Sequence, residues 1–408
     1  MFLEILFSIF LGIFFGTITG LIPGIHPNTV FALMIAATLA SQSVSINPLS
    51  MIVFIISFSV TNTFTDFLPT LFFGVPDPET SLSVLPGHRF LLSGSGYEAL
   101  FLTVLGGVGV TILTILTFPL LLYLIPMIYN TFRFSIHLLL LSIAVWMIIT
   151  EKGKAKYYAV FVFLLSGILG TILLNTLPEN KVLFPALTGL FGLSSLFISM
   201  INKTKLPPQS SSIKPQRKYL KALLTGWFAG LVSGMLPGAG VSQSAIIGAQ
   251  MFRAKTRDFL IAMGGINTAN ILFTFIMFYT LGKTRSGAVA ALSEMGIEIN
   301  PHDIPLIIIT VLISCCISSI ITLKTGRYML LSMKTMEYQK INALMILILL
   351  ILVFVLSNWI GIVISVTSMC LGMLCILTGT RRTHLMGFLV LPTIFYFSGM
   401  NFIILSTL

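Results

Sequence analysis

Long apolar runs constrain this chain more than any other feature of its sequence. Five of them cover residues 101–128, 133–150, 157–175, 340–357 and 359–379. Each is long enough to cross a bilayer, which takes about 20 residues as a helix. Helices are expected because lipid offers no partner for exposed backbone N–H and C=O groups. The short alternating segments of about 10 residues that a barrel needs are not found. The runs therefore predict an all-α polytopic membrane protein.

Composition supports the same class. Hydrophobic residues make up 56% of the chain and charged residues only 9%, with a mean hydropathy of +1.03. A soluble domain carries charge on about a quarter of its residues. The first apolar run begins at Met1, contains Glu4 and lacks a basic region before it. It is therefore expected to be a retained helix rather than a signal peptide.

The net charge of +11 is concentrated in two polar loops. The first holds Lys203, Lys205, Lys214, Arg217, Lys218 and Lys221 without an acidic residue, and the second holds Lys324, Arg327, Lys334 and Lys340. An excess of Lys and Arg in loops marks the cytoplasmic side of a membrane protein. This distribution favours the lipid bilayer over nucleic acid as a partner, and it predicts a multi-pass protein of the inner, or cytoplasmic, cell membrane.

An internal repeat follows from two similar segments, 14–29 (FFGTITGLIPGIHPNT) and 228–243 (FAGLVSGMLPGAGVSQ). At an offset of 214, Phe14, Gly16, Gly20, Pro23 and Gly24 match Phe228, Gly230, Gly234, Pro237 and Gly238. A weaker match follows in the same order, 61–74 with 269–282, and it aligns Asn62 with Asn270 and Gly74 with Gly282. Self-similarity of this kind indicates two copies of one structural unit.

The repeat predicts a first membrane unit at 1–201, a basic cytoplasmic linker at 202–221 and a second membrane unit at 222–408. An odd number of spans in each unit inverts the second relative to the first, as in many secondary transporters. The expected fold is thus an all-α polytopic membrane protein with two inverted-topology repeats, each broken at a Pro-Gly motif. Both termini would then face outward, and a homo-oligomer is possible.

The Pro-Gly motifs are expected to interrupt their helices. Proline removes a helical hydrogen bond and clashes with the preceding turn, and glycine relaxes the backbone further. Pro27 suits the first turn of a following half-helix, and Ser242 suits an N-cap in the second copy. Two half-helix N-termini meeting at the bilayer midplane would present free N–H groups to a small anion. The alternative is a pair of proline kinks that only shape packing.

Candidate site residues come from these tips and from polar residues in apolar surroundings. Substrate binding is assigned to Gly24, His26, Asn28, Thr29, Gly238, Gly240, Ser242, Gln243, Asn267 and Asn270, and ion coupling to Asn62 and Asp66. An ionisable group inside a membrane usually faces a pathway, so Asp66 is expected to bind a coupling cation or carry a proton. It would otherwise lie at a helix end in contact with water. His26 is expected either to bind a carboxylate or to cap a helix.

Two turn-rich segments follow the polar stretches. Residues 73–80 lead to Leu85-Pro86-Gly87-His88-Arg89, and residues 282–287 occupy the corresponding place in the second half. They are expected to gate a substrate path, with Lys283 or Arg285 attracting anions, or to be solvated loops. No phosphate-binding Gly-rich loop and no cluster with metal-ligand spacing is found. The sequence therefore predicts no enzyme, no metal site and no cofactor beyond a coupling Na⁺ or H⁺.

The chain resembles a known family at these residues. The paired Gly-x-x-x-Gly-x-x-Pro-Gly segments, Gly16 to Gly24 and Gly230 to Gly238, are similar to the signature of the large membrane subunit of tripartite tricarboxylate transporters. The segment that includes Val75-Pro76-Asp77, Leu85-Pro86-Gly87-His88 and Glu98-Ala99-Leu100 is also similar, as is 184–192. The chain resembles a divergent member, because His26 replaces a glycine and Gly87-His88-Arg89 departs from Asp-Gly-Tyr-Pro.

The resemblance implies uptake of organic anions, di- or tricarboxylates, driven by an ion gradient. It also implies two partners, a small membrane subunit and an extracytoplasmic binding protein. Two other functions remain open from the residues alone. A flippase would hold a lipid-linked phosphate at helix N-termini and at Arg89 or Arg285. A non-transporting membrane scaffold would have no water-accessible cavity at the tips.

Overall fold

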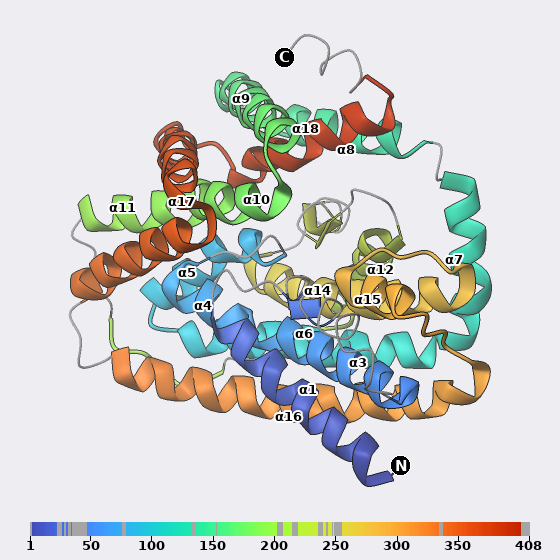
Figure 1. Ribbon diagram of the computed structural model, residues 1–408. Helices are drawn as coiled ribbons and strands as arrows, with labels where there is room; N and C mark the ends of the chain where they lie inside the picture. Colours follow the sequence, from blue (N-terminus) through green and yellow to red (C-terminus); the bar gives the residue numbers. More distant parts are fainter. Residues whose placement is uncertain are drawn as a thin grey trace.

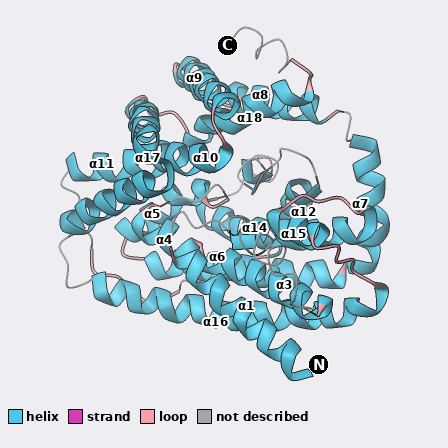
Figure 2. Cartoon of the chain, viewed as in Figure 1, coloured by secondary structure: helices cyan, strands magenta, loops and turns pink. Residues whose placement is uncertain are grey.

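The computed structural model describes most of the chain. The described residues are 2–22, 27, 30–31, 34, 47–75, 79–132, 135–151, 153–201, 207–213, 219–235, 240–241, 244–246, 248, 255–333 and 338–400. The secondary structure of these residues is helical, and no strand occurs among them (Figure 2). The predicted all-α class is confirmed.

The helices follow one another with short connections (Figure 1). They are α1 (Phe2–Leu21), α3 (Pro48–Thr65), α4 (Phe67–Phe73), η1 (Ser81–Ser83), α5 (Val84–Leu92), α6 (Gly96–Leu116), α7 (Phe118–Phe132), α8 (Ile136–Ile149), α9 (Ala155–Thr176), α10 (Glu179–Leu187), η2 (Thr188–Leu193), α11 (Ser194–Ile201), α12 (Leu220–Met235), α14 (Thr256–Leu281), α15 (Gly287–Glu294), η3 (Pro301–Asp303), α16 (Ile304–Met333), α17 (Tyr338–Leu377), η4 (Arg382–Met386) and α18 (Gly387–Phe397).

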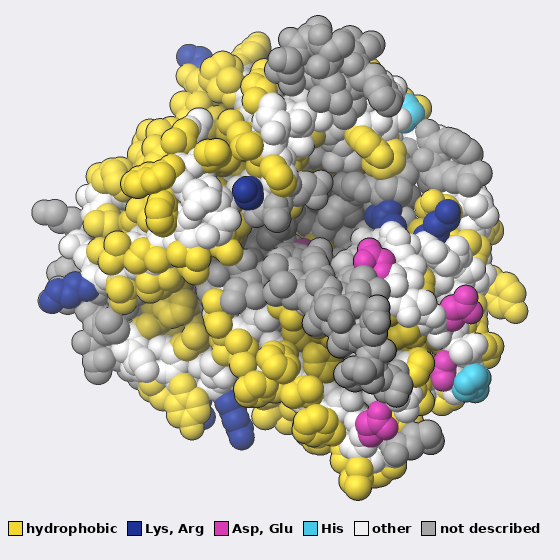
Figure 3. All heavy atoms as spheres, viewed as in Figure 1, with side chains coloured by type: hydrophobic (Ala, Val, Ile, Leu, Met, Phe, Trp, Pro, Cys, Tyr) yellow, Lys and Arg dark blue, Asp and Glu magenta, His cyan; other side chains and the backbone are white. Residues whose placement is uncertain are grey.

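Eight helical stretches of the described chain are long and apolar enough to cross a membrane. They are Phe2–Leu21, Pro48–Phe73, Gly96–Leu116, Ala155–Thr176, Lys181–Ile201, Thr256–Leu281, Pro301–Met333 and Asn342–Leu377. Hydrophobic side chains cover broad areas of the face shown in Figure 3, and charged ones are few and scattered on it. The protein is a multi-pass membrane protein.

The apolar runs correspond to helices with two corrections. The run 101–128 is not one helix, because α6 ends at Leu116 and α7 begins at Phe118. Pro119 explains the break, since it has no N–H to donate to the preceding turn. The run 133–150 forms α8, whose 14 residues are too short for a full span. The division between 340–357 and 359–379 falls at Asn358, where the φ of 55° kinks α17.

Two pairs of helices pack in the same way. Glycines let α1 approach α3, and α12 approach α14, so closely that a Cβ would overlap the neighbouring helix at most of these positions. The contacts are Gly12 with Phe54 and Ser57, Gly16 with Phe58 and Thr61, Gly20 with Thr65 and Asp66, then Gly226 with Ala262 and Gly265, Gly230 with Ala269, and Gly234 with Asn270 and Phe273. The residue numbers rise together in both pairs, so the two helices of each pair run parallel.

The two pairs run in opposite directions. Glu98 forms an ion pair with Arg257, so α6 and α14 begin at the same end of the protein. A Cβ at Gly326, late in α16, would meet Leu68 and Leu100, so α3–α4 ends near the beginning of α6. It follows that α3–α4 ends where α14 begins. These directions agree with the predicted inversion of the second half, whose equivalence to the first as a repeat stays a prediction.

The linker contacts this same end of the protein. Gln209 donates to the Leu91 carbonyl at 2.8 Å and accepts from the Gly96 N–H at 3.1 Å, and Ser210 N–H donates to the Gly94 carbonyl. The end at which α6 and α14 begin is called the linker end below. The predicted boundaries at 201 and 222 lie close to the end of α11 and the start of α12. The division of the chain into these three parts stays a prediction.

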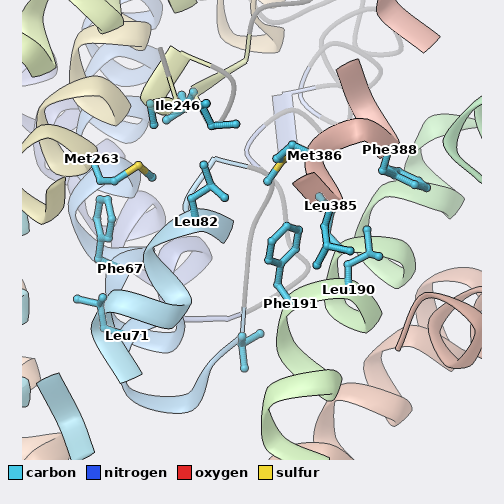
Figure 4. Close-up of a cluster of buried hydrophobic side chains, with 14 of the residues drawn as sticks. Phe67, Leu71, Leu82, Leu190, Phe191, Ile246, Met263, Leu385, Met386 and Phe388 are labelled. Atoms are coloured by element: carbon cyan, nitrogen blue, oxygen red, sulfur yellow. The ribbon is translucent and has the colours of Figure 1, made fainter. Parts of the chain in front are cut away.

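The helices form two bundles, each of which draws on both halves of the sequence. The first bundle contains α1, α3 to α7, α12 and α14 to α16, and the second contains α8 to α11, η2, α17, η4 and α18. Contacts between described helices are dense within each bundle and sparse between them. Figure 4 shows Phe67 and Met263 of the first bundle on one side and Phe191 and Phe388 of the second on the other. The bundles therefore meet along a hydrophobic seam.

Candidate functional site

A buried acid lies where α3 crosses α14. Asp66 is 1% exposed, and its Oδ2 accepts a hydrogen bond of 2.7 Å from Asn267 Nδ2. Asn267 is fully buried, and its Nδ2 also lies 3.3 Å from the Thr63 carbonyl. Next to them, the hydroxyls of Thr63 and Thr268 are 3.1 Å apart. The expected alternative for Asp66, a helix end in contact with water, is wrong because the residue is buried.

A proline places Asp66 at a break in its helix. Asp66 lies between α3 and α4, and Pro69 in the first turn of α4 has no N–H for the Thr65 carbonyl. The Thr70 hydroxyl donates to the Asp66 carbonyl at 2.9 Å and so satisfies one backbone acceptor. No proline interrupts α14, and it runs unbroken past Asn267. The carboxyl group therefore lies beside irregular backbone within the membrane-spanning stretch.

Two matching hydrogen bonds flank this centre. Asn62 Nδ2 donates to Thr19 Oγ1 at 3.1 Å, which ties the last turn of α1 to α3. Ser233 Oγ donates to Asn270 Oδ1 at 2.9 Å, which ties the last turn of α12 to α14. The sequence alignment pairs the two asparagines, and the offset of 214 also pairs Thr19 with Ser233. Each bond lies just before a Pro-Gly motif, so it fixes the helix that leads to the predicted tip.

Sequence reasoning missed a hydroxyl stripe on α16. Thr310, Ser314, Ser318 and Thr322 are spaced by four residues and are all fully buried. Ser318 Oγ donates to Thr61 Oγ1 at 2.8 Å, whereas the other three hydroxyls have no hydrogen-bond partner among the described atoms. The four-residue spacing was a usable signal, because it places one face of a helix toward the core. The stripe extends the polar lining toward α3.

Most predicted tip residues lie outside the described residues. This applies to Gly24, His26, Asn28, Thr29, Gly238, Ser242 and Gln243. Gly240 is described and exposed, and its carbonyl accepts from the Ser244 N–H at 3.0 Å. A helix therefore begins at Val241, and the N-cap position falls to Gly240 rather than to Ser242. The structure brings Asn62, Asp66, Asn267 and Asn270 to one interface, that of α3 and α14 with their partner helices.

The acidic residue of the resembled Glu98-Ala99-Leu100 segment has a structural partner. Glu98 is buried, and its ion pair with Arg257 joins the first turns of α6 and α14. In the second loop, Lys283 is exposed, whereas burial lowers the pKa of Arg285 to about 10. The Arg285 guanidinium therefore keeps its charge at neutral pH. Both loop cations remain available to attract anions.

The arrangement suits ion handling rather than catalysis. The carboxylate of Asp66, the amide oxygen of Asn267 and the nearby hydroxyls are oxygen ligands of the kind that bind hard cations, and a buried carboxylate also carries protons in transporters. The described residues include no group of three or more His, Cys, Asp and Glu side chains that could hold a metal ion. Polar groups buried between helices at a helix break define a membrane transporter.

The comparisons place the chain in a family of that class. The model of the tripartite tricarboxylate transporter TctA family matches residues 6–387, and the chain belongs to this family. It is also 30% identical over 356 residues to the uncharacterized protein MJ1079 of Methanocaldococcus jannaschii, covering 84% of this chain and 88% of that protein. No solved structure matches the chain. The protein is a transporter of the family, and the predicted resemblance is confirmed.

Proposed function

We propose that the protein is a secondary active transporter of small organic anions, di- or tricarboxylates, in the cell membrane. The observation that carries the proposal is the buried Asp66–Asn267 pair at the crossing of α3 and α14. A carboxylate in a membrane core is costly, by about 2.5–3.5 kcal/mol on lenient scales, so it is kept where an ion passes. Membership of the family supports an organic anion as the cargo.

In this proposal Asp66 takes up the coupling Na⁺ or H⁺, with Asn62 supporting its helix. Neutralising the carboxylate removes a negative charge from the core, which favours entry of an anion next to it. The substrate is assigned to the two Pro-Gly tips, at Gly24, His26, Asn28 and Thr29 and at Gly238, Gly240, Ser242 and Gln243, with Asn267 and Asn270 beside them. Free N–H groups at helix starts bind carboxylates through charge-assisted hydrogen bonds.

Alternating access in this proposal comes from displacement of one bundle relative to the other. A surface that slides needs few interlocking contacts, and the described helices of the two bundles contact one another sparsely. Cavities of about 570 and 390 Å³ also lie at the seam, each with lining residues from both bundles. A loosely packed seam costs less to rearrange than a close-packed core.

The test is uptake of labelled citrate, succinate and related carboxylates by proteoliposomes, with an imposed Na⁺ or pH gradient. We expect accumulation that collapses when the gradient is dissipated. Gly24→Leu and Gly238→Leu are expected to abolish uptake while membrane insertion stays intact. Normal uptake by both variants would remove the tips from the proposal. Uptake by no preparation under any gradient would favour a non-transporting scaffold.

The same assay tests the partners. The family implies an extracytoplasmic binding protein and a small membrane subunit, and we propose that both act with this chain. Uptake is expected to rise when they are added to the proteoliposomes. An equal rate with and without them would indicate that the chain works alone.

A further inference from the structure

A cavity of about 390 Å³ lies at the seam between the bundles, apart from the proposed transport site. The first bundle contributes Arg89 of α5, and the second contributes Arg381 and Arg382 at the start of η4. No residue proposed above for substrate or ion lines it. The cavity therefore needs an explanation of its own.

The cavity is strongly cationic. None of the described residues that line it is acidic. Arg381 Nε is 3.3 Å from Glu151 Oε1, but the same oxygen is also 3.0 Å from His384 Nε2. Arg89 is exposed and pairs with no acidic side chain in the part of the chain that the structure describes. Three guanidinium groups thus share one nearby carboxylate.

One of the three arginines is fixed in place. Arg382 is 8% exposed, and its Nη1 donates to the Phe191 carbonyl at 3.0 Å and to Ser195 Oγ at 2.5 Å. Burial, and to a lesser degree the positive charge of Arg89, lower the pKa of Arg382 to about 10, so its guanidinium stays charged at neutral pH. Holding like charges near one another with so little compensation is unfavourable unless an anion joins them.

Apolar side chains complete the lining. Leu82, Phe191 and Phe259 face the same cavity as the arginines, and Figure 4 shows Leu82 and Phe191 approaching from opposite sides of the seam. A cationic pocket with an apolar wall, set between membrane helices, is the combination that binds phosphate-bearing lipid headgroups. A free phosphate needs only the cationic part.

We propose that this cavity binds a phosphate group, held by Arg89 of the first bundle and by Arg381 and Arg382 of the second. The planar guanidinium fork matches two phosphate oxygens at once, and a doubly charged phosphate balances the excess positive charge. The group belongs either to an anionic phospholipid or to a free phosphate. Because its ligands come from both bundles, the bound phosphate links the two across the seam.

The test compares Arg89→Gln with a matched variant, Arg327→Gln. Both remove one exposed arginine, but Arg327 lies on α16 and does not line the cavity. Calorimetry in detergent with inorganic phosphate, at constant ionic strength, tests the free anion. Native mass spectrometry after reconstitution in phosphatidylglycerol or phosphatidylcholine tests the headgroup. A lost charge-assisted contact corresponds to at least a roughly tenfold weaker affinity for the Arg89→Gln protein.

The outcomes are distinct. Saturable phosphate binding that Arg89→Gln weakens and Arg327→Gln keeps supports a free phosphate. Retention of phosphatidylglycerol, but not phosphatidylcholine, that depends on Arg89 in the same way supports a lipid headgroup. The proposal is overturned when Arg89→Gln binds both probes like the unmodified protein, or when chloride competes as well as phosphate. Arg382→Gln is a weaker test, because losing its bonds to Phe191 and Ser195 can prevent folding; transport assays are not needed for any arm.

Discussion

Asp66 and Asn267 lie 201 residues apart in the chain and share a hydrogen bond of 2.7 Å in the core of the protein. Asp66 belongs to the first half of the sequence and Asn267 to the second, so the bond joins the two halves at their most buried polar point. Both residues come from helices that follow a Pro-Gly motif. Any ion that reaches Asp66 therefore acts on the contact between the two halves.

The first prediction concerns the charge of Asp66. Asp66→Asn keeps the size of the side chain but cannot release a proton or bind a cation as a carboxylate, so we expect gradient-driven uptake to fall at least about 100-fold, or about 2.7 kcal/mol at 1.36 kcal/mol for each factor of ten. The measurement is the initial rate in proteoliposomes. Exchange of substrate without a gradient is expected to survive better, because it needs no net movement of the ion.

Glu294→Gln is the matched control for this change, since it neutralises an exposed acid at the end of α15. It is expected to transport normally. Asn267→Leu should lower stability by about 1–3 kcal/mol, because it leaves a buried carboxyl group without one of its partners. Full gradient-driven uptake by Asp66→Asn would show that the acid is structural.

The second prediction concerns the approach of α6 to α14. A Cβ at Gly106 would overlap the backbone carbonyl of Ile261, which cannot turn away. We expect Gly106→Ala to cost about 1–3 kcal/mol and to lower the unfolding midpoint. At Gly109, on the same helix, the Cβ would lie 2.6 Å from Leu223 Cδ2, the flexible end of a side chain. Gly109→Ala is therefore the control, and equal losses from the two changes would contradict the argument.

The sequence allowed much of the helical framework to be predicted, since long apolar runs and proline positions act locally. The split of α17 at Asn358 was visible as a polar residue between two apolar runs, and the pairing of Gly74 with Gly282 is matched by left-handed helix ends at φ 67° and 63°. The break before Phe118 was missed, because Thr117 and Pro119 do not interrupt the apolar composition of the run.

The site was less predictable, because its contacts join residues far apart in the chain. Asp66 and Asn267 were each chosen for being polar in an apolar stretch, but nothing in the sequence indicated their direct hydrogen bond. Arg381 and Arg382 were not chosen at all, since a basic pair between two apolar runs looks like an ordinary loop. Only the packing of η4 against Phe191 turns one of them inward.

The third prediction concerns pH. Burial, followed by the charge of Arg382, lowers the pKa of His88 from 6.5 to about 4. Between these values the unfolded chain binds a proton that the folded protein does not, so stability falls as the pH falls through this window, by at most about 1.4 kcal/mol per unit. We expect the unfolding midpoint in detergent to drop between pH 7 and 5, and His88→Gln to reduce that drop.

His302→Gln is the control for His88, because the His302 side chain is 80% exposed. It should leave the pH dependence of the midpoint unchanged. Since other groups also titrate in this range, the comparison is between slopes and not between absolute midpoints. Identical slopes for the unmodified protein and His88→Gln would contradict the burial argument.

The last prediction tests movement along the seam. Phe73 of the first bundle and Leu344 of the second line the same cavity of about 570 Å³. With Cys316 and Cys370, the exposed cysteines, replaced by serine, Phe73→Cys and Leu344→Cys can be joined by a cleavable bifunctional thiol reagent. If transport requires the bundles to slide, the linked protein should lose more than about 90% of its uptake, roughly a tenfold change in rate, and regain it on reduction. Linking Glu4→Cys to Ser50→Cys, whose native side chains are hydrogen-bonded within the first bundle, should have little effect. Complete linkage across the seam with uptake unchanged would mean that access alternates within a bundle and not between them.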